Sequence, residues 1–177
     1  MNKKITTKKT VNYKNIIFWG VIGLITLAFI IAVIVRFIGS RTVNNYDSIE
    51  HLVGEEIFEQ TEETYIVYLY SSDSQYEEAV GAMDEIIFNY VTFQKRNSDD
   101  ADVYKLYAVD LADPENAKAV VFESETNMLV GSQFSDLKVS DKSIPVLIVI
   151  KKGSVISYDI TENDISDYLQ TIIEENK

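Results

Sequence analysis

The sequence of 177 residues contains no cysteine, one histidine and two prolines. Without cysteine the chain has no disulfide, no thiolate nucleophile and no sulfur ligand for zinc or an iron–sulfur cluster. The single imidazole, His51, excludes any site that needs two histidines. Basic residues are scarce as well, since 16 Lys and Arg face 28 Asp and Glu and give a net charge of -12. This balance predicts no nucleic-acid partner, because phosphates attract clustered Lys and Arg, and we expect no cofactor.

One long hydrophobic run occupies residues 16–38, and only Arg36 interrupts it with a charge. A bilayer core of about 30 Å requires roughly 20 apolar residues of α-helix, so the run predicts one membrane-spanning helix. A cleaved signal peptide is the alternative. Its apolar stretch is typically about 7–15 residues long and precedes a small-x-small cleavage site, which residues 37–41 lack.

Basic residues on either side of the run predict its direction. Residues 1–15 carry five lysines and no acid, whereas only Arg36 and Arg41 lie near the other end. This excess places the N-terminus in the cytoplasm and the acidic remainder outside it. The predicted single-pass protein of the cell membrane has a basic cytoplasmic tail (1–15), a transmembrane helix (16–38), a tether (39–45) and an extracytoplasmic domain (46–177).

Short helices and strands alternate in the predicted domain. Apolar residues at three-and-four spacing from Ile49 to Phe58, with Asp47 as N-cap, predict a first helix. Continuous β-branched and aromatic residues predict buried strands. The further elements expected are strands at 64–70, 103–109, 144–151 and 154–160, and helices at 76–96, after Asp113 and from Thr161 to 173.

This order predicts an α/β fold with a mixed four-stranded sheet that helices cover on both faces. The first two strands need a right-handed parallel crossover, and a turn at Lys152–Gly153 joins the last two as a hairpin. Residues 122–141 show no strong period, so we expect an irregular insertion there.

Three local features of residues 47–175 resemble the thioredoxin-like fold family. Ile144–Val149 resembles the segment around the family's cis-proline, and Lys151–Val155 resembles the hairpin turn that follows it. Tyr70–Ile86 resembles the end of the first strand, the active-site loop and the long helix. The resemblance implies a cis bond between Ile144 and Pro145 and a surface there that binds extended polypeptide through main-chain hydrogen bonds.

The resemblance breaks at the active-site loop. Ser74, Gln75, Tyr76 and Glu77 match the four positions of the family's Cys-x-x-Cys, and none supplies the sulfur that thiol–disulfide exchange requires. The family's oxidoreductase activity is therefore not expected. Ser74 as a nucleophile of another kind would need a base and an orienting group. Capping of the following helix is the expected role of Ser74, and we expect His51 at the surface or its boundary.

Acids and tyrosines leave further alternatives. Runs such as Asp99, Asp100 and Asp102 lack the spacing of a calcium loop, so we interpret them as solvated surface and expect no metal site. The tyrosines at 65, 68, 70 and 76 could line a groove, because tyrosine is enriched at binding surfaces, but core packing is the default for strand aromatics.

These features favour a non-catalytic domain that binds a peptide or protein partner beside Ile144, Pro145 and the Ser74–Glu77 loop. One alternative is an accessory subunit of an envelope redox or secretion system whose thiols belong to a partner. Another is an enzyme that uses the carboxylates of Asp73 and Glu77. Acid–base catalysis by this pair would need environments that give the two groups different pKa values.

Overall fold

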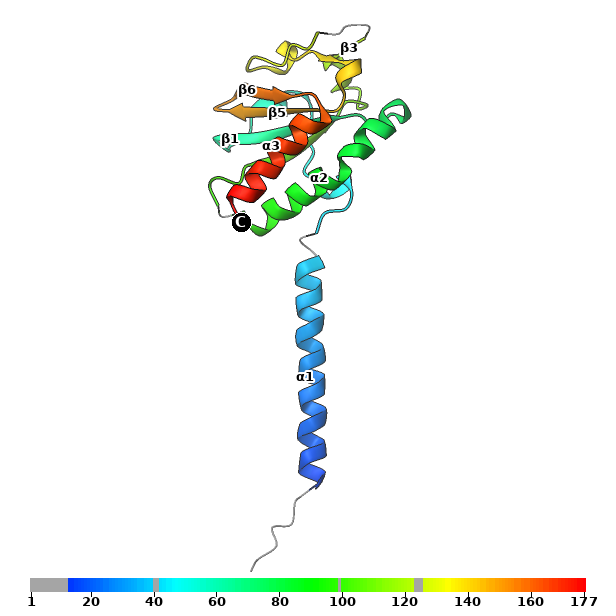
Figure 1. Ribbon diagram of the computed structural model, residues 1–177, viewed down its shortest axis with the longest axis vertical. Helices are drawn as coiled ribbons and strands as arrows, with labels where there is room; N and C mark the ends of the chain where they lie inside the picture. Colours follow the sequence, from blue (N-terminus) through cyan, green and yellow to red (C-terminus); the bar gives the residue numbers. More distant parts are fainter. Residues whose placement is uncertain (1–12, 40–41, 99, 123–125) are drawn as a thin grey trace, which may run out of the picture. The chain divides into compact units, whose positions relative to one another are not determined.

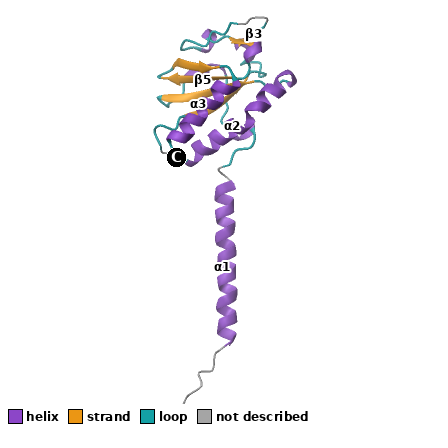
Figure 2. Ribbon diagram, viewed as in Figure 1, coloured by secondary structure: helices purple, strands orange, loops and turns teal. Residues whose placement is uncertain are grey.

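The computed structural model describes residues 13–39, 42–98, 100–122 and 126–177, drawn in colour in Figures 1 and 2. The chain divides into two compact units, residues 1–40 and 41–177. Several features named above lie outside the described residues: most of the basic tail (1–12), Arg41, Asp99 and part of the insertion (123–125).

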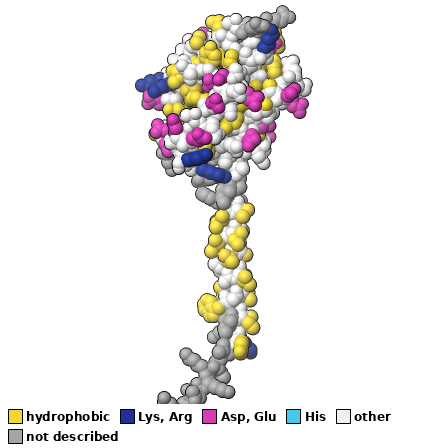
Figure 3. All heavy atoms as spheres, in the orientation of Figure 1, with side chains coloured by type: hydrophobic (Ala, Val, Ile, Leu, Met, Phe, Trp, Pro, Cys, Tyr) yellow, Lys and Arg dark blue, Asp and Glu magenta, His cyan; other side chains and the backbone are white. Residues whose placement is uncertain are grey.

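The first unit contains one helix, α1, from Tyr13 to Gly39. Its segment Ile17–Val35 has a mean hydropathy of 2.8, and its apolar side chains are exposed (Figure 3). The Thr26 hydroxyl donates to the Ile22 carbonyl at 2.9 Å, so even this polar group is bonded within the helix. α1 is therefore long and apolar enough to cross a membrane.

The second unit is built on a four-stranded sheet in the order β2-β1-β5-β6. β1 (Thr64–Tyr70) pairs parallel to β2 (Lys105–Asp110) and antiparallel to β5 (Val146–Lys151), and β5 forms a hairpin with β6 (Ser154–Asp159). This confirms the predicted mixed sheet. The strand order, the helical crossover between β1 and β2 and the terminal hairpin are those of a thioredoxin-like fold.

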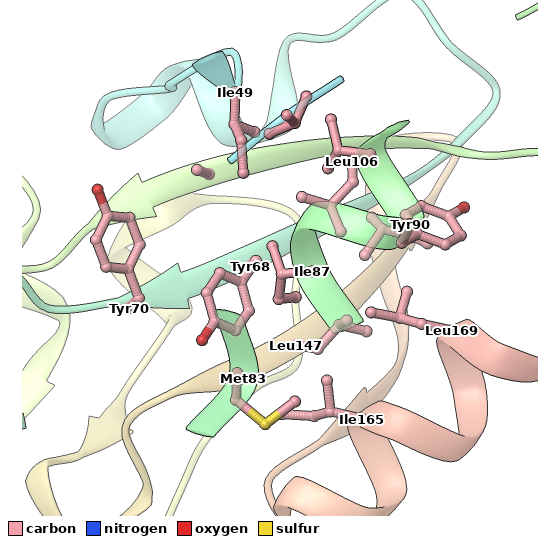
Figure 4. Packing of buried hydrophobic residues seen from close by; sticks show 14 of the residues in the cluster. Ile49, Tyr68, Tyr70, Met83, Ile87, Tyr90, Leu106, Leu147, Ile165 and Leu169 are labelled. Atoms are coloured by element: carbon pink, nitrogen blue, oxygen red, sulfur yellow. The ribbon is translucent and has the colours of Figure 1, made fainter. Parts of the chain in front are cut away.

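Both long helices of this unit pack on one face of the sheet. α2 (Glu77–Arg96) and α3 (Glu162–Glu175) bury their apolar stripes against alternate side chains of the strands. Figure 4 shows Tyr68 and Leu147 of the sheet beside Met83 of α2 and Ile165 of α3. α3 begins as predicted, because the Thr161 side chain accepts a hydrogen bond from the Asp164 amide at 3.2 Å.

The opposite face is covered without an α-helix among the described residues. Its core residues come from short turns and from the excursion between β2 and β5, which supplies the buried Leu129, Leu137 and Val139. The excursion contains a small parallel pair, β3 (Val120–Val121) with β4 (Val139–Ser140). Short 3-10 helices complete this layer: η2 (Gly54–Phe58), η4 (Ala117–Ala119), η5 (Phe134–Asp136) and η6 (Asp141–Ser143). The expectation of helices on both faces is thus wrong for this face as far as α-helices are concerned, because 3-10 turns and extended chain cover it.

The predicted first helix is also wrong. Two 3-10 turns, η1 (Tyr46–Ser48) and η2, take its place, and the chain between them is extended. Main-chain hydrogen bonds of 2.9 Å join both Glu50 and Leu52 to Ala108 of β2, and Gly54 has a positive φ of 49°. A long-range pairing and a left-handed glycine therefore outweigh the helical spacing of the apolar residues.

Smaller differences concern element ends. The second strand begins at Lys105 rather than 103, and the short helix expected after Asp113 is a turn followed by η4. At the start of the unit, the side chain of Val43 is buried and its amide donates to the Thr92 hydroxyl of α2 at 2.9 Å. The docked chain therefore begins before the expected domain start at residue 46.

Candidate functional site

The loop that matches the family's active site leaves the carboxyl end of β1. Ser74 lies in the 3-10 turn η3 (Ser74–Tyr76), and Glu77 is the first residue of α2. The side chains of Ser74, Gln75 and Glu77 are exposed, whereas Tyr76 is partly buried. The loop is held by its own backbone and by Asp110, whose carboxylate accepts from the Ser72 amide at 3.0 Å.

Ser74 does not cap α2. The N-cap position is Tyr76, and no side chain of the described residues accepts a hydrogen bond there. The prediction for Ser74 fails because the 3-10 turn Ser74–Tyr76 precedes α2 and moves the N-cap from Ser74 to Tyr76. Ser74 therefore has neither a capping role nor a buried environment.

The bond between Ile144 and Pro145 is cis, as the resemblance implies. Ile144 has an extended backbone, with φ -74° and ψ 128°, and lies directly before β5. Its side chain is buried. An extended backbone beside a cis bond is a segment to which a partner strand can add.

Tyr76 brings this segment and the loop together. Its ring packs against the core cluster that contains Ile144 and Val146. Burial raises the pKa of Tyr76, and the nearby carboxylates of Asp141 and Asp73 raise it further. Tyr76 thus lies between its own loop and the turn that precedes Pro145, so its hydroxyl stays protonated and can donate a hydrogen bond.

Asp141 was not singled out from the sequence, although it belongs to this surface. Its Oδ1 atom is buried and has no hydrogen-bond partner among the described residues. An unpaired buried acceptor of this kind is uncommon in folded proteins. Only the folded arrangement, in which η6 approaches Tyr76, identifies it; the sequence around residue 141 carries no motif.

The structure engages both nitrogens of His51. Nδ1 lies 3.0 Å from the Ile49 carbonyl, which only accepts, so Nδ1 carries the proton. In the neutral ring Nε2 then accepts from the Tyr70 hydroxyl at 2.9 Å. Burial raises the pKa of Tyr70 to about 12, which keeps its hydroxyl a donor. His51 is therefore committed to structural hydrogen bonds and is not a base for Ser74.

The tyrosine groove is contradicted in part. Tyr65, Tyr68 and Tyr70 are buried, and Tyr65 faces the opposite side of the sheet from the other two. Tyr70 stacks on Tyr46 with ring centroids 4.4 Å apart. Core packing explains these strand aromatics, and of the four only Tyr76 lies at the candidate surface.

The described carboxylates give little support to metal or acid–base chemistry. Asp73 and Glu77 are exposed, so neither has the buried setting that catalytic acids and bases use. Across residues 13–39, 42–98, 100–122 and 126–177, no three His, Asp or Glu side chains are grouped to hold a metal ion. A surface cavity of about 500 Å³ lies elsewhere, between η2 and η5, and is lined by Glu55, Glu59, Lys118, Phe134 and Lys138 among others. It contains none of the predicted site residues.

Comparison with known proteins finds matches among solved structures. No known family matches the chain, and no curated protein matches it. Mitochondrial thioredoxin 3 from Saccharomyces cerevisiae is 13% identical with a TM-score of 0.39, over 71% of this chain and 97% of its own. A structure on the thiol-resolving mechanism of a yeast mitochondrial 1-Cys peroxiredoxin matches at 10% identity and a TM-score of 0.43, over 71% and 97%. A complex of ferredoxin:thioredoxin reductase with thioredoxin f2 matches at 10% and 0.44, over 73% and 96%.

Proposed function

We propose that this chain is a single-pass membrane protein whose thioredoxin-like domain lies outside the cytoplasm and binds an extended segment of a partner protein without redox chemistry. One observation carries the proposal: Tyr76 packs against the core cluster that contains Ile144, and so joins the sulfur-free loop to the extended segment at the cis bond. This surface offers main-chain and aromatic contacts. It has no sulfur with which to exchange electrons.

The anchoring part of the proposal rests on α1 and on charge. The apolar stretch of α1 is long enough to span a bilayer. The lysines of residues 1–15 favour a cytoplasmic N-terminus. Residues 39–177 hold all 28 acids and 10 of the 16 basic residues, a net charge of -18. An acidic domain is repelled by anionic lipid headgroups, which favours a domain that stands clear of the membrane.

The partner-binding part is tested by site-specific photocrosslinking of the full-length chain in native membranes. A photoreactive phenylalanine derivative replaces Tyr76 in one variant and Tyr168 in the control; both tyrosines are partly buried, and Tyr168 lies on α3. We expect one or more discrete protein adducts at Tyr76 that the Tyr168 variant does not form. Equal adduct patterns at the two positions would contradict a binding surface beside Ile144.

The direction of the chain is tested with single cysteines, which are unambiguous in a chain that has none of its own. Asp167→Cys should react with a membrane-impermeant maleimide in intact cells, whereas Asn2→Cys should react only after lysis. The reverse pattern would place the domain in the cytoplasm. In a separate assay, the purified full-length chain should reduce a protein disulfide no faster than buffer does.

A further inference from the structure

Three exposed apolar side chains of the second unit follow one another along an edge of the sheet. Among its described residues, the large hydrophobic side chains that are exposed lie in the excursion (Phe122, Met128, Val130) and along and just beyond β6 (Ile156, Tyr158, Ile160). These segments meet where the Val155 amide donates to the Gly131 carbonyl at 3.0 Å. Along and just beyond β6, Ile156, Tyr158 and Ile160 are 58%, 44% and 39% exposed.

β6 is an edge strand with little protection along its second half. In the described sheet it pairs only with β5, beside which it lies in Figure 1. Edge strands are usually guarded by lysine, proline or a bulge. A register shift opposite Val149–Ile150 and the contact with Gly131 guard the first half of β6. Residues 157–160 contain neither lysine nor proline, and Asp159 is their one charged side chain.

The charges at the two ends of β6 are opposite. Exposed Lys151 and Lys152 precede the strand, and Asp159, Glu162 and Asp164 follow it. At the acidic end, burial and then the neighbouring Asp164 raise the pKa of Asp159. An antiparallel neighbour with the same sequence would place its lysines at this acidic end and receive the reverse contact at the other end.

We propose that β6 pairs antiparallel with β6 of a second copy of this chain, so that the two sheets become one continuous sheet. The two-fold axis passes near Tyr158, so that residues 157–159 of the two copies pair. The exposed Ile156 and Ile160 flank this pairing, and the lysine end of each copy faces the acidic end of the other. This surface is self-complementary, as an isologous interface requires. The net repulsion between two acidic domains is screened beyond about 8 Å at physiological ionic strength, and the centre of the interface is uncharged.

Disulfide trapping of the full-length chain in native membranes tests the pairing. Residues opposite each other in antiparallel strands have Cβ atoms about 4.5–5.5 Å apart, close to the span of a disulfide. Under mild oxidation, Tyr158→Cys should form a chain-to-chain disulfide at about ten times the yield of the exposed control Asp167→Cys. Equal yields would overturn the proposal, and so would a Tyr158→Cys adduct with a different protein.

A second measurement does not depend on an introduced thiol. The mass of the purified chain in detergent or nanodiscs, followed over a concentration series, should show a dimer that Tyr158→Lys weakens about tenfold or more, because the buried centre would gain two like charges. Asp167→Lys should leave the dimer unchanged. The double substitution Lys151→Glu and Lys152→Glu reverses the charge at one end of β6 and should weaken the dimer. Adding Asp159→Lys and Asp164→Lys to this variant reverses the charge at the other end and should restore the dimer. A monomer at every concentration, or a dimer indifferent to Tyr158→Lys, would contradict the proposal.

Discussion

The two faces of the sheet are covered by different kinds of structure. One face carries α2 and α3, whose apolar stripes pack on Tyr68, Leu147 and their neighbours (Figure 4). The other carries short turns and the excursion between β2 and β5, which contribute single buried side chains such as Leu137. A layer without long helices is thus still closely packed: its buried side chains come from turns and short strands rather than from the periodic stripe of a helix.

The largest effect should come from truncating buried leucines on both faces. Leu137 of the excursion and Leu169 of α3 are both fully buried. If both layers are true core, Leu137→Ala and Leu169→Ala should each lower the free energy of unfolding by about 2–5 kcal/mol. Urea unfolding of the full-length chain in detergent, followed by the tyrosine near-ultraviolet circular dichroism, measures this. A loss below about 1 kcal/mol for Leu137→Ala alone would show a loosely packed excursion.

Asn116 should have a smaller but still large effect. Its buried side chain accepts from the Gly54 amide at 2.8 Å and donates to the Asp110 carbonyl at 2.9 Å, so it ties η2 to the end of β2. Asn116→Ala should lower the free energy of unfolding by about 1–3 kcal/mol, since two buried backbone groups lose their partner. The exposed Asn163→Ala serves as control and should be near neutral. Equal stability of the two variants would show that the Asn116 hydrogen bonds do not stabilise the fold.

Two tyrosine hydroxyls give a matched pair across the faces. Tyr65 donates to the Ile57 carbonyl of η2, and Tyr90 donates to the Tyr104 carbonyl beside α2, both at 2.7 Å. Tyr65→Phe and Tyr90→Phe should each lower the free energy of unfolding by about 1 kcal/mol. The same unfolding measurement compares them. If only Tyr90→Phe is destabilising, the turn η2 is not held as the structure describes.

The smallest effect concerns pH and differs in sign between two carboxyls. Burial alone would raise the pKa of Glu62, but a backbone N–H, the Tyr107 hydroxyl and Lys105 together lower it. Burial and Asp164 raise the pKa of Asp159. The stability from Glu62 is therefore present above its unfolded-state pKa and is lost as the pH falls through its folded-state pKa. For Asp159 stability is gained as the pH falls through its raised folded-state pKa. Carboxyl ¹³C titration should place the two on opposite sides of their ordinary values; shifts of the same sign would contradict this difference.

The helical face could be predicted from the sequence, and the other face could not. Local sequence patterns predict both β1 and α2. The run 64–70 is continuously β-branched and aromatic, and the sequence of α2 has helical periodicity. The 47–58 segment has helical spacing as well, yet it pairs with Ala108, a contact that no local pattern encodes. Within the excursion, single buried leucines separated by turns give no period to detect.

The candidate site itself stays a prediction, of which the cis bond between Ile144 and Pro145 is confirmed. Its two halves, the loop at 74–77 and the Ile144–Pro145 segment, followed from the resemblance. The roles within it did not, because they depend on where η3 and η6 turn. Ser74 does not cap α2, because the helix begins only at Glu77. Asp141 belongs to the site because η6 lies near Tyr76.

The most direct test of the account is whether Tyr76 bridges the two halves of the site. Nuclear Overhauser effects between the Tyr76 ring and the methyl groups of Val139, Ile144 and Val146 measure this in the isotopically labelled, full-length chain. We predict cross-peaks from Tyr76 to at least one of these methyl groups. Their absence, while cross-peaks between Tyr46 and Tyr70 are present, would separate the loop from the Ile144 segment and contradict the proposed binding surface.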